Sequence, residues 1–526
     1  MTPTRASGNP LRRVPLERSG DVHVRENSNR PLRIMKFGGT SVGDASCIER
    51  VVSIIRAASR ESDTVVVISA MSGVTNKLID AALQSRAGNR EAIANIFTDL
   101  RKQHEAAVNA LIHPDAKRQH IQQHMQGLFQ AAERLCEGTA LLGELTPQAR
   151  DSVSSLGERL CAPLVAAALA ERGVASQYVD ATELVVTDSY HGNAEPWIDL
   201  TRTRSEARLR PLLRKGLVPV VTGFIGATED GVLTTLGRGG SDYSATILGA
   251  ALAADEVVIW TDVDGLLTAD PRQVHDACLI PEISYRAASE LAYFGAKVLH
   301  PKALLPVMQS GIPLVIRNTF APEKLGTKIT QAGAANRKEV TALTAIGDAA
   351  LIIVGGPALV GVPDVLGRTF ATTAAVRADV LLISQSSSQN DICLVVSFPH
   401  AKRTVEALRH EFAHDLEREK LEHITLDSTV GIVTIVGQGV RGMSEILNRT
   451  FAALGRENLD VIAIAHGASA CKLSFVVAKK DMQAALIAVH REFQLGVPDS
   501  RLLPARSADQ LRVAVYESGR ARADAD

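Results

Sequence analysis

The sequence predicts a three-layer α/β/α unit with a mainly parallel central sheet, followed by two small α+β units. Short β-branched runs alternate with helix-like segments over residues 31–330. These runs are apolar on both faces, which is typical of parallel strands covered by helices on each side. Beyond them, one pattern recurs at a spacing of 81 residues, and such self-similarity indicates two copies of one supersecondary unit. At 526 residues the chain also exceeds what one hydrophobic core usually supports.

Taken in order, the elements expected in the first unit are β-branched strands and apolar-periodic helices. The expected strands are 33–37, 64–69, 218–222, 256–261 and 314–318. The expected helices are 43–59, 91–110, 120–137, 160–172, 205–215 and 244–254. A hairpin is expected over 226–236, because Asp230-Gly231 is typical turn chemistry.

The repeat defines the C-terminal organisation. Gly356 matches Gly437, Arg368 matches Arg449, and Gln385 matches His466. Strand pairing between the copies would bury their edges. A glycine- and alanine-rich stretch at 326–338 is interpreted as a linker. The expected boundaries are a tail at 1–30, the α/β/α unit at 31–330, a linker or strand at 331–345, the two repeats at 346–428 and 429–505, and a solvated tail at 506–526.

Composition excludes several classes of function. Lys plus Arg is 57 and Asp plus Glu is 58, which gives no reason to expect nucleic acid or a membrane surface as a partner. The six cysteines are scattered, without C-x-x-C pairs or metal-ligand spacing. We therefore expect free thiols, a cytoplasmic location and no protein-bound metal. Residues 1–30 lack the apolar run of a secretory signal, and their acidic residues argue against the alternative of a transit peptide.

The most informative motif is an apolar strand that ends in Lys36 and breaks into Gly38-Gly39-Thr40-Ser41. Such a turn lets backbone N–H groups and a helix N-terminus face an anion. Lys36 would add a mobile positive charge for phosphate oxygens. An ordinary glycine turn with a surface lysine is the alternative.

A second glycine-rich segment, Thr235-Leu236-Gly237-Arg238-Gly239-Gly240-Ser241-Asp242, joins the expected hairpin to a helix. Backbone donors there could hold phosphate, and the planar guanidinium of Arg238 could grip a carboxylate with two hydrogen bonds. Asp242 could accept hydrogen bonds from Lys36 and keep its ammonium group in place. Simple N-capping would explain Ser241 and Asp242 but not Arg238.

Two further segments carry candidate ligand residues. Residues 261–272 (TDVDGLLTADPR) follow the strand 256–261, and polar loops at the carboxyl ends of parallel strands are where α/β folds bind ligands. In 294–301 (FGAKVLHP), Lys297 could reach nucleotide phosphates. The chain contains no G-x-x-x-x-G-K-[ST] and no H-R-D or D-F-G motif. A P-loop and protein-kinase machinery are therefore excluded.

Together these segments resemble the aspartate kinase family of the amino-acid kinase superfamily. The resemblance covers about residues 32–478 and rests on KFGGTSVGD, SAMSGVTN, SLGERL, GFIGAT, TLGRGGSDYSA, TDVDGLLTADPR and FGAKVLHP. It implies that the repeats are paired ACT domains, which bind effector amino acids. It also implies ATP-dependent phosphorylation of the β-carboxylate of L-aspartate, with Mg²⁺ carried by the nucleotide.

The resemblance assigns roles position by position. Those it implies in catalysis are Lys36, Asp242 and Lys297. Those it implies in substrate binding are Thr40, Ser41, Ser69, Thr75, Glu158, Phe224, Arg238 and Ser241, with Arg238 for the α-carboxylate and Glu158 for the ammonium group. Those it implies in ATP binding are Lys36, Gly38, Gly39, Thr261, Asp262, Leu267, Asp270, Arg272, Lys297 and Val298. Many relatives have tyrosine where this chain has Leu267, so adenine would pack against an aliphatic side chain.

For regulation, the resemblance points to effector binding at Gln385, Ser386 and His466. His466 stands where the first repeat has glutamine, which puts an equivalent second effector site in doubt. The pattern is most similar to threonine-sensitive members, with lysine as the alternative effector. We further expect a monofunctional chain and a homodimer formed through the repeats. A kinase with another acidic acceptor and a catalytically inactive amino-acid sensor are the competing hypotheses.

Overall fold

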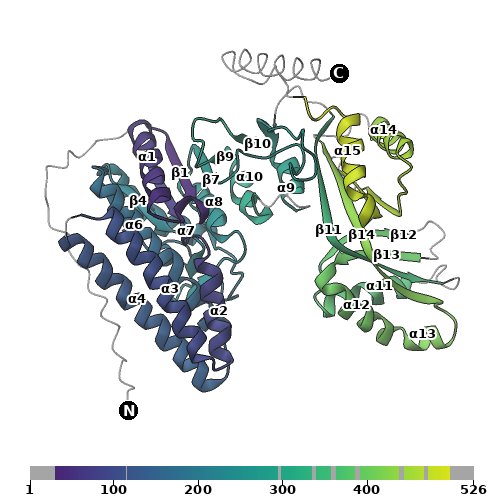
Figure 1. Ribbon diagram of the computed structural model, residues 1–526, viewed down its shortest axis with the longest axis horizontal. Helices are drawn as coiled ribbons and strands as arrows, with labels where there is room; N and C mark the ends of the chain where they lie inside the picture. Colours follow the sequence, from purple (N-terminus) through teal and green to yellow (C-terminus); the bar gives the residue numbers. More distant parts are fainter. Residues whose placement is uncertain are drawn as a thin grey trace, which may run out of the picture.

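The computed structural model describes residues 30–113, 115–293, 298–333, 339–356, 363–385, 391–437, 443–466 and 472–497. Figure 1 shows an N-terminal α/β body and a C-terminal region built around the long strands β11 (Val340–Gly355) and β14 (His423–Gly437). We call this second region the paired repeats.

The described strands of the N-terminal body form an eight-stranded sheet of order β3-β4-β2-β1-β7-β9-β10-β8. Every neighbouring pair is parallel except β9 with β10, which confirms the expected mainly parallel sheet. A separate hairpin, β5 (Ile225–Ala227) with β6 (Leu233–Thr235), lies where the Asp-Gly turn predicted one. The sheet strands are β1 Leu32–Phe37, β2 Asp63–Ile68, β3 Ser176–Val179, β4 Val218–Thr222, β7 Glu256–Thr261, β8 Glu282–Ser284, β9 Leu314–Asn318 and β10 Thr327–Thr330.

Helices cover both faces of this sheet, as predicted. One face packs against α1 Ala45–Glu61, α2 Val74–Arg86, α3 Arg90–Leu111, α4 Asp115–Leu142 and α6 Leu156–Glu171. The other packs against α7 Ile198–Arg214, α8 Gly240–Leu252, α9 Tyr285–Tyr293 and α10 Leu305–Ser310. Each helix expected in this body is present with shifted ends, whereas α2, α5 (Pro147–Ser154), α9 and α10 were not expected.

The alternation of side chains along β1 determines where its lysine lies. Met35 and Phe37 enter the core shared with α1, whereas Ile34 enters the opposite core with α8. Successive side chains of a strand point to opposite faces, so Lys36 lies on the α8 side.

The order of the strands determines where a ligand site forms. From β1 the chain continues to β2 and β4 on one side, and it later returns to place β7 and β9 on the other. Such a reversal leaves a crevice at the carboxyl ends of the adjacent strands. The turns after β1, β2 and β7 all reach this edge, and they carry the lysine motif, Ser69 and the loop 261–272.

The paired repeats share a single six-stranded antiparallel sheet of order β12-β13-β11-β14-β16-β15. The two copies meet where β11 pairs with β14, so the expected pairing between copies is confirmed. Within β11, residues 349–355 pair with β13, while 340–346 pair only with β14. The remaining elements are α11 Pro363–Ala375, β12 Val380–Gln385, β13 Asp391–Ser397, α12 Phe398–Glu411, α13 Ala413–Glu417, α14 Met443–Arg456, β15 Ala463–His466, β16 Lys472–Ala478 and α15 Met482–Glu492.

The 81-residue spacing is visible in matching contacts. In the first repeat the Arg368 guanidinium pairs with Glu411 at 2.8 Å and lies 4.5 Å from the Phe412 ring centroid. In the second, Arg449 pairs with Glu492 at 3.0 Å and lies 4.5 Å from the centroid of Phe493. Equivalent contacts at equivalent positions confirm the internal repeat.

The segment interpreted as a linker at 326–338 is partly structured. Thr327–Thr330 forms β10, which adds to the main sheet between β9 and β8. The interpretation missed this strand because four residues carry too little periodicity to distinguish a short edge strand from a loop.

The N-terminal body and the second repeat also share a hydrophobic core. Ala269 and Val274, from the loop after β7, are buried with Leu343 of β11 and with Leu486 and Val489 of α15. His490 of α15 is 1% exposed, and its Nε2 lies 3.1 Å from Thr268 Oγ1. The loop therefore folds partly as a component of the second repeat.

Among the described residues, one helical stretch, Pro147–Glu171, is long and apolar enough to cross a bilayer on length and composition alone. Of its most apolar window, 78% is buried inside the fold. Its side chains are part of the core under α2 and α3. Among the described cysteines, Cys47, Cys136, Cys161 and Cys393 have free thiols.

Candidate active site

Lys36 and Asp242 meet at the carboxyl edge of the sheet. The Lys36 ammonium group forms an ion pair with the carboxylate of Asp242, in the first turn of α8. Both side chains are buried. Pairing offsets part of the cost of burying these two charges. The predicted juxtaposition of the two glycine-rich turns is therefore present.

The turn that carries Arg238 can hold only glycine at key positions. Gly239 has φ +71°, and a Cβ added there would lie 2.4 Å from His300 Cβ. Gly240 faces Phe224 in the same way, with an added Cβ 2.6 Å from Phe224 Cδ2. Phe224 itself has φ +69°, an unusual conformation for a bulky residue that the surrounding packing must hold. Close packing thus fixes the path of the turn.

Glu158 is a buried carboxyl group aimed at the same site. It lies in the first turn of α6, is 2% exposed, and its Oε2 has no hydrogen-bond partner in the described structure. Burial raises the pKa of Glu158 to about 8, although backbone N–H groups and the nearby Lys36 oppose the shift. A buried oxygen without a partner fits a cationic group of a ligand.

This burial predicts a pH-dependent stability. Between its ordinary pKa and about 8, Glu158 holds a proton when folded that the unfolded chain has released. Raising the pH from about 5 to about 8 should therefore lower the free energy of unfolding of the ligand-free protein. Denaturant melts across this range measure the slope. Glu158→Gln should flatten it, and an equal slope in the variant would contradict the assignment.

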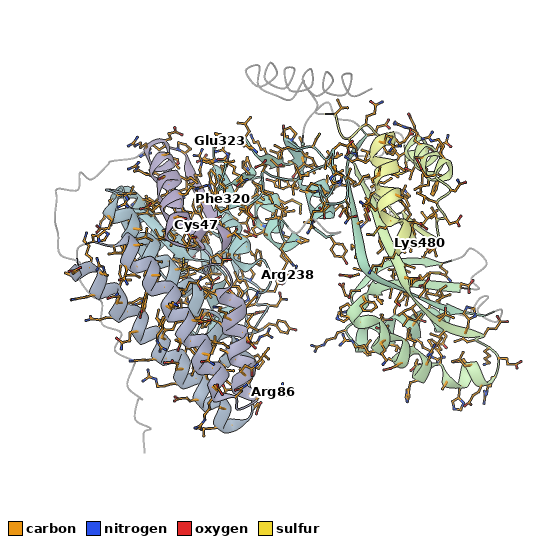
Figure 2. The ribbon with its side chains drawn as sticks, viewed as in Figure 1. Cys47, Arg86, Arg238, Phe320, Glu323 and Lys480 are labelled. Carbon is orange, nitrogen blue, oxygen red and sulfur yellow. The ribbon has the colours of Figure 1, made fainter. Side chains whose placement is uncertain are left out.

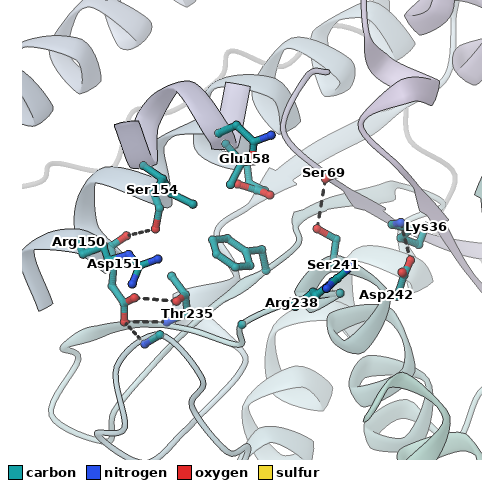
Figure 3. A pocket seen from close by; sticks show the side chains of 18 residues that line it. Lys36, Ser69, Arg150, Asp151, Ser154, Glu158, Thr235, Arg238, Ser241 and Asp242 are labelled. Atoms are coloured by element: carbon teal, nitrogen blue, oxygen red, sulfur yellow. Dashed lines mark hydrogen bonds and ion pairs between the residues drawn. The ribbon is translucent and has the colours of Figure 1, made fainter. Parts of the chain in front are cut away.

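Six of the eight predicted substrate residues line one cavity of about 470 Å³, shown in Figure 3. Lys36 and Asp242 lie at one end, and Arg150 and Asp151 lie at the other. The hydroxyls of Ser69 and Ser241 lie 3.3 Å apart between them. The predicted residues in this lining are Lys36, Ser69, Thr75, Glu158, Phe224, Arg238, Ser241 and Asp242. The exposed Arg238 has no ion-pair partner in the described part of the chain, and Figure 2 shows it at the surface of the N-terminal body.

The structure does not bring the whole lysine motif to this cavity. Ser41 is fully buried, and its Oγ lies 2.7 Å from Thr319 Oγ1, so its hydroxyl is used inside the fold. Thr40 is exposed outside the cavity lining. Gly38 and Gly39 likewise lie outside the lining; the Gly38 N–H donates to the Trp260 carbonyl at 3.2 Å.

Six of the predicted nucleotide positions line a second cavity of about 470 Å³, whereas Lys36, Gly38 and Gly39 lie outside it. Arg272 is already held by Asp270 through two hydrogen bonds of 3.0 and 2.6 Å. Leu267 contributes to the aliphatic wall. The predicted residues in this lining are Thr261, Asp262, Leu267, Asp270, Arg272 and Val298. Lys297 lies outside the described residues.

Reasoning from the sequence missed residues at both cavities. Leu343, Thr344, Ala345 and Leu486 of the paired repeats complete the second one, and no local pattern links them to a loop so distant in sequence. Arg150 and Asp151 of α5 line the first. The signal for α5 was present, because Thr146 caps the helix and proline occupies its first position.

The predicted effector positions lie at the ends of two edge strands. Gln385 ends β12, and His466 ends β15, with its Nδ1 3.3 Å from the Lys472 carbonyl oxygen. Both side chains are exposed. Ser386 lies outside the described residues.

These features define a class of protein: an α/β/α fold with a glycine-lined cavity and a buried lysine–aspartate pair at the edge of a mainly parallel sheet, joined to paired α+β repeats. Residues 31–318 match the model of the amino acid kinase family, and 352–412 and 433–493 each match an ACT domain.

Aspartokinases of known sequence or structure are similar to this chain over both matched regions. Aspartokinase 1 of Arabidopsis thaliana is 30% identical over 93% of this chain and 84% of its own. A bifunctional aspartokinase/homoserine dehydrogenase of the same plant is 32% identical over 91% of this chain and 53% of its own. Escherichia coli aspartokinase III, solved with aspartate and ADP, has a TM-score of 0.73 at 29% identity, covering 88% of this chain and 99% of its own.

The chain therefore belongs to the amino acid kinase family, and within it to the aspartokinases. It spans about half the length of the bifunctional relatives it matches.

Proposed function

We propose that this protein transfers the γ-phosphoryl group of ATP to the β-carboxylate of L-aspartate, giving L-4-aspartyl phosphate and ADP. The observation that carries the proposal is the buried Lys36–Asp242 pair in a cavity that also holds Arg238 and Glu158. E. coli aspartokinase III, which shares the fold over nearly its whole length, was solved with aspartate and ADP.

The proposed substrate roles follow from charge. Arg238 is an exposed guanidinium that can hold the α-carboxylate with two hydrogen bonds. Glu158 has a free buried oxygen for the ammonium group. When the ammonium group binds, Glu158 loses its proton, because an adjacent cation favours the carboxylate. Ser69, Thr75 and Ser241 lie on the same wall to orient the reacting carboxylate.

The proposed chemistry is electrostatic. The β-carboxylate is ionised near neutral pH, so no general base is needed. One of its oxygens bonds to the γ-phosphorus in line while the bond to the bridging oxygen of ADP breaks. Two anions must meet, and Lys36 lies where it can stabilise the equatorial phosphoryl oxygens, held there by Asp242. Mg²⁺ enters with the nucleotide and supplies further positive charge.

The second cavity is the proposed nucleotide site, with the loop 261–272 on its wall. The resemblance adds Lys297 as a further proposed phosphate-binding residue. The ACT repeats are the proposed site of feedback by threonine or lysine, through Gln385, Ser386 and His466. The T-state of E. coli aspartokinase III was solved with lysine and aspartate. Such feedback requires the effector to bind two states unequally. We also propose that the protein is cytoplasmic and forms a homodimer through the repeats. The domain boundaries given above are part of the proposal.

Steady-state ADP production with MgATP tests this function. Aspartate should support turnover, and hydroxylamine should trap the acyl phosphate as a hydroxamate. Glutamate and N-acetylglutamate are the matched acceptors, and turnover with either instead of aspartate would favour another kinase of this fold. Threonine or lysine at millimolar concentration should shift activity or the melting temperature. If neither does, feedback by these amino acids is wrong.

A further inference from the structure

We propose that Asp151 is a positioning residue that holds the two halves of the aspartate site at their working separation. This inference rests on the proposed function, because it assigns Arg238 and Glu158 to the same substrate. Asp151 was not among the residues that the sequence singled out.

The Asp151 carboxylate is a buried junction of four hydrogen bonds. It is 2% exposed, in the last two turns of α5. Its Oδ2 accepts from the Gly192 N–H at 3.1 Å, from the Thr235 N–H at 3.1 Å and lies 2.9 Å from His191 Nδ1. Its Oδ1 accepts from the Thr235 hydroxyl at 2.7 Å. Figure 3 shows the contacts with Thr235 at the end of the cavity opposite Lys36.

These hydrogen bonds join three separate segments. On one side, α5 leads through Ser155 directly into α6, whose first turn carries Glu158. On another, Thr235 is the last residue of β6, three positions before Arg238. The carboxylate thus ties α5, which leads into the helix that carries Glu158, to β6, which leads into the turn that carries Arg238.

The third segment, residues 191–193, packs against the Arg238 turn. A Cβ added at Gly237 would lie 2.8 Å from Asn193 Oδ1 and 3.0 Å from the Gly192 carbonyl oxygen. The Lys302 ammonium group donates to Asn193 Oδ1 at 2.9 Å, which fixes that side chain. The Asp151 carboxylate holds this third segment through the Gly192 N–H and holds β6 through Thr235. Displacement of the carboxylate would therefore free the Arg238 turn from both of these contacts.

The size of the effect follows from the chemistry of the junction. An aspartate can accept all four hydrogen bonds, whereas an asparagine offers one acceptor oxygen and places an NH₂ group against other donors. Buried donors left without a partner drive local rearrangement. Misplacement of a binding group by about 1 Å can cost about a hundredfold in catalytic efficiency.

The test compares kinetic constants for the two substrates in Asp151→Asn. We expect KM for aspartate to rise at least about tenfold and KM for ATP to stay within about twofold, since the nucleotide cavity does not include α5. A merely structural role would lower the active fraction and leave both KM values unchanged. The inference would therefore be overturned if both KM values stayed at those of the wild type, or if KM for aspartate and KM for ATP rose by the same factor.

Two companion variants keep the test decisive. Thr201→Val removes another buried hydroxyl, which accepts from the Val186 N–H at 3.0 Å away from the cavity. It should lower stability without changing KM for aspartate. If Asp151→Asn does not fold, Thr235→Val removes one of the four hydrogen bonds, and its KM for aspartate should rise alone. Wild-type protein assayed in parallel separates failure of this inference from failure of the proposed function. If the wild type shows no aspartate-dependent ADP release, it is the proposed function that is refuted.

Discussion

Replacing Lys36 with alanine should lower kcat by more than about a hundredfold, the scale of losing one preorganised charge at a developing anion. The ammonium group is buried, paired with Asp242, and placed where the reacting anions of the proposed reaction converge. Because this charge acts mainly in the transition state, KM for aspartate should change far less than kcat. Steady-state ADP release over a range of both substrates measures the two constants.

A matched lysine provides the control. Lys77 also forms an ion pair, with Asp99 at 3.3 Å, but the side chains of Lys77 and Asp99 are 41% and 66% exposed on the outer helices. Lys77→Ala should leave kcat within about twofold, as expected for a surface pair worth little. An unchanged kcat in Lys36→Ala would remove Lys36 from the mechanism.

Replacing Arg238 with alanine should raise KM for aspartate by about a hundredfold, because two charge-assisted hydrogen bonds to a carboxylate are lost. Arg238→Lys should recover only part of the affinity, since a single ammonium group cannot reproduce the planar fork. KM for ATP should stay near that of the wild type. Substrate titrations of the three proteins measure these constants.

The control is another exposed arginine of the same body. Arg86, in the last turn of α2, lies outside the aspartate cavity (Figure 2). Arg86→Ala should leave both KM values unchanged. If Arg238→Ala binds aspartate as well as the wild type does, the α-carboxylate is held elsewhere.

Local sequence predicted well that Lys36 and Asp242 would meet. Lys36 and Asp242 each lie in a glycine-rich turn between a strand and a helix, and such turns have a recognisable composition. Once the strands were expected to be parallel, their carboxyl ends had to meet at one edge. The repeat was also predictable from the sequence, because matching residues recur at a spacing of 81 positions.

What could not be predicted depends on contacts between distant segments. The hydrogen bonds of Asp151 join it to residues that lie between 40 and 84 positions further along the chain. No periodicity in the sequence indicates such contacts. The contribution of Leu343 and Leu486 to the nucleotide cavity arises only because the loop after β7 shares a core with α15. Ser41 shows a further limit, since its place in a motif did not reveal that its hydroxyl forms a hydrogen bond with Thr319 inside the fold.

The most direct test of the central claim is a crystal structure of this protein with aspartate and ADP bound. We expect the aspartate α-carboxylate on Arg238, its ammonium group on Glu158, and its β-carboxylate beside Lys36 and facing the terminal phosphate of ADP. Aspartate bound away from the Lys36–Asp242 pair, or ADP bound outside the cavity formed by loop 261–272, would contradict it.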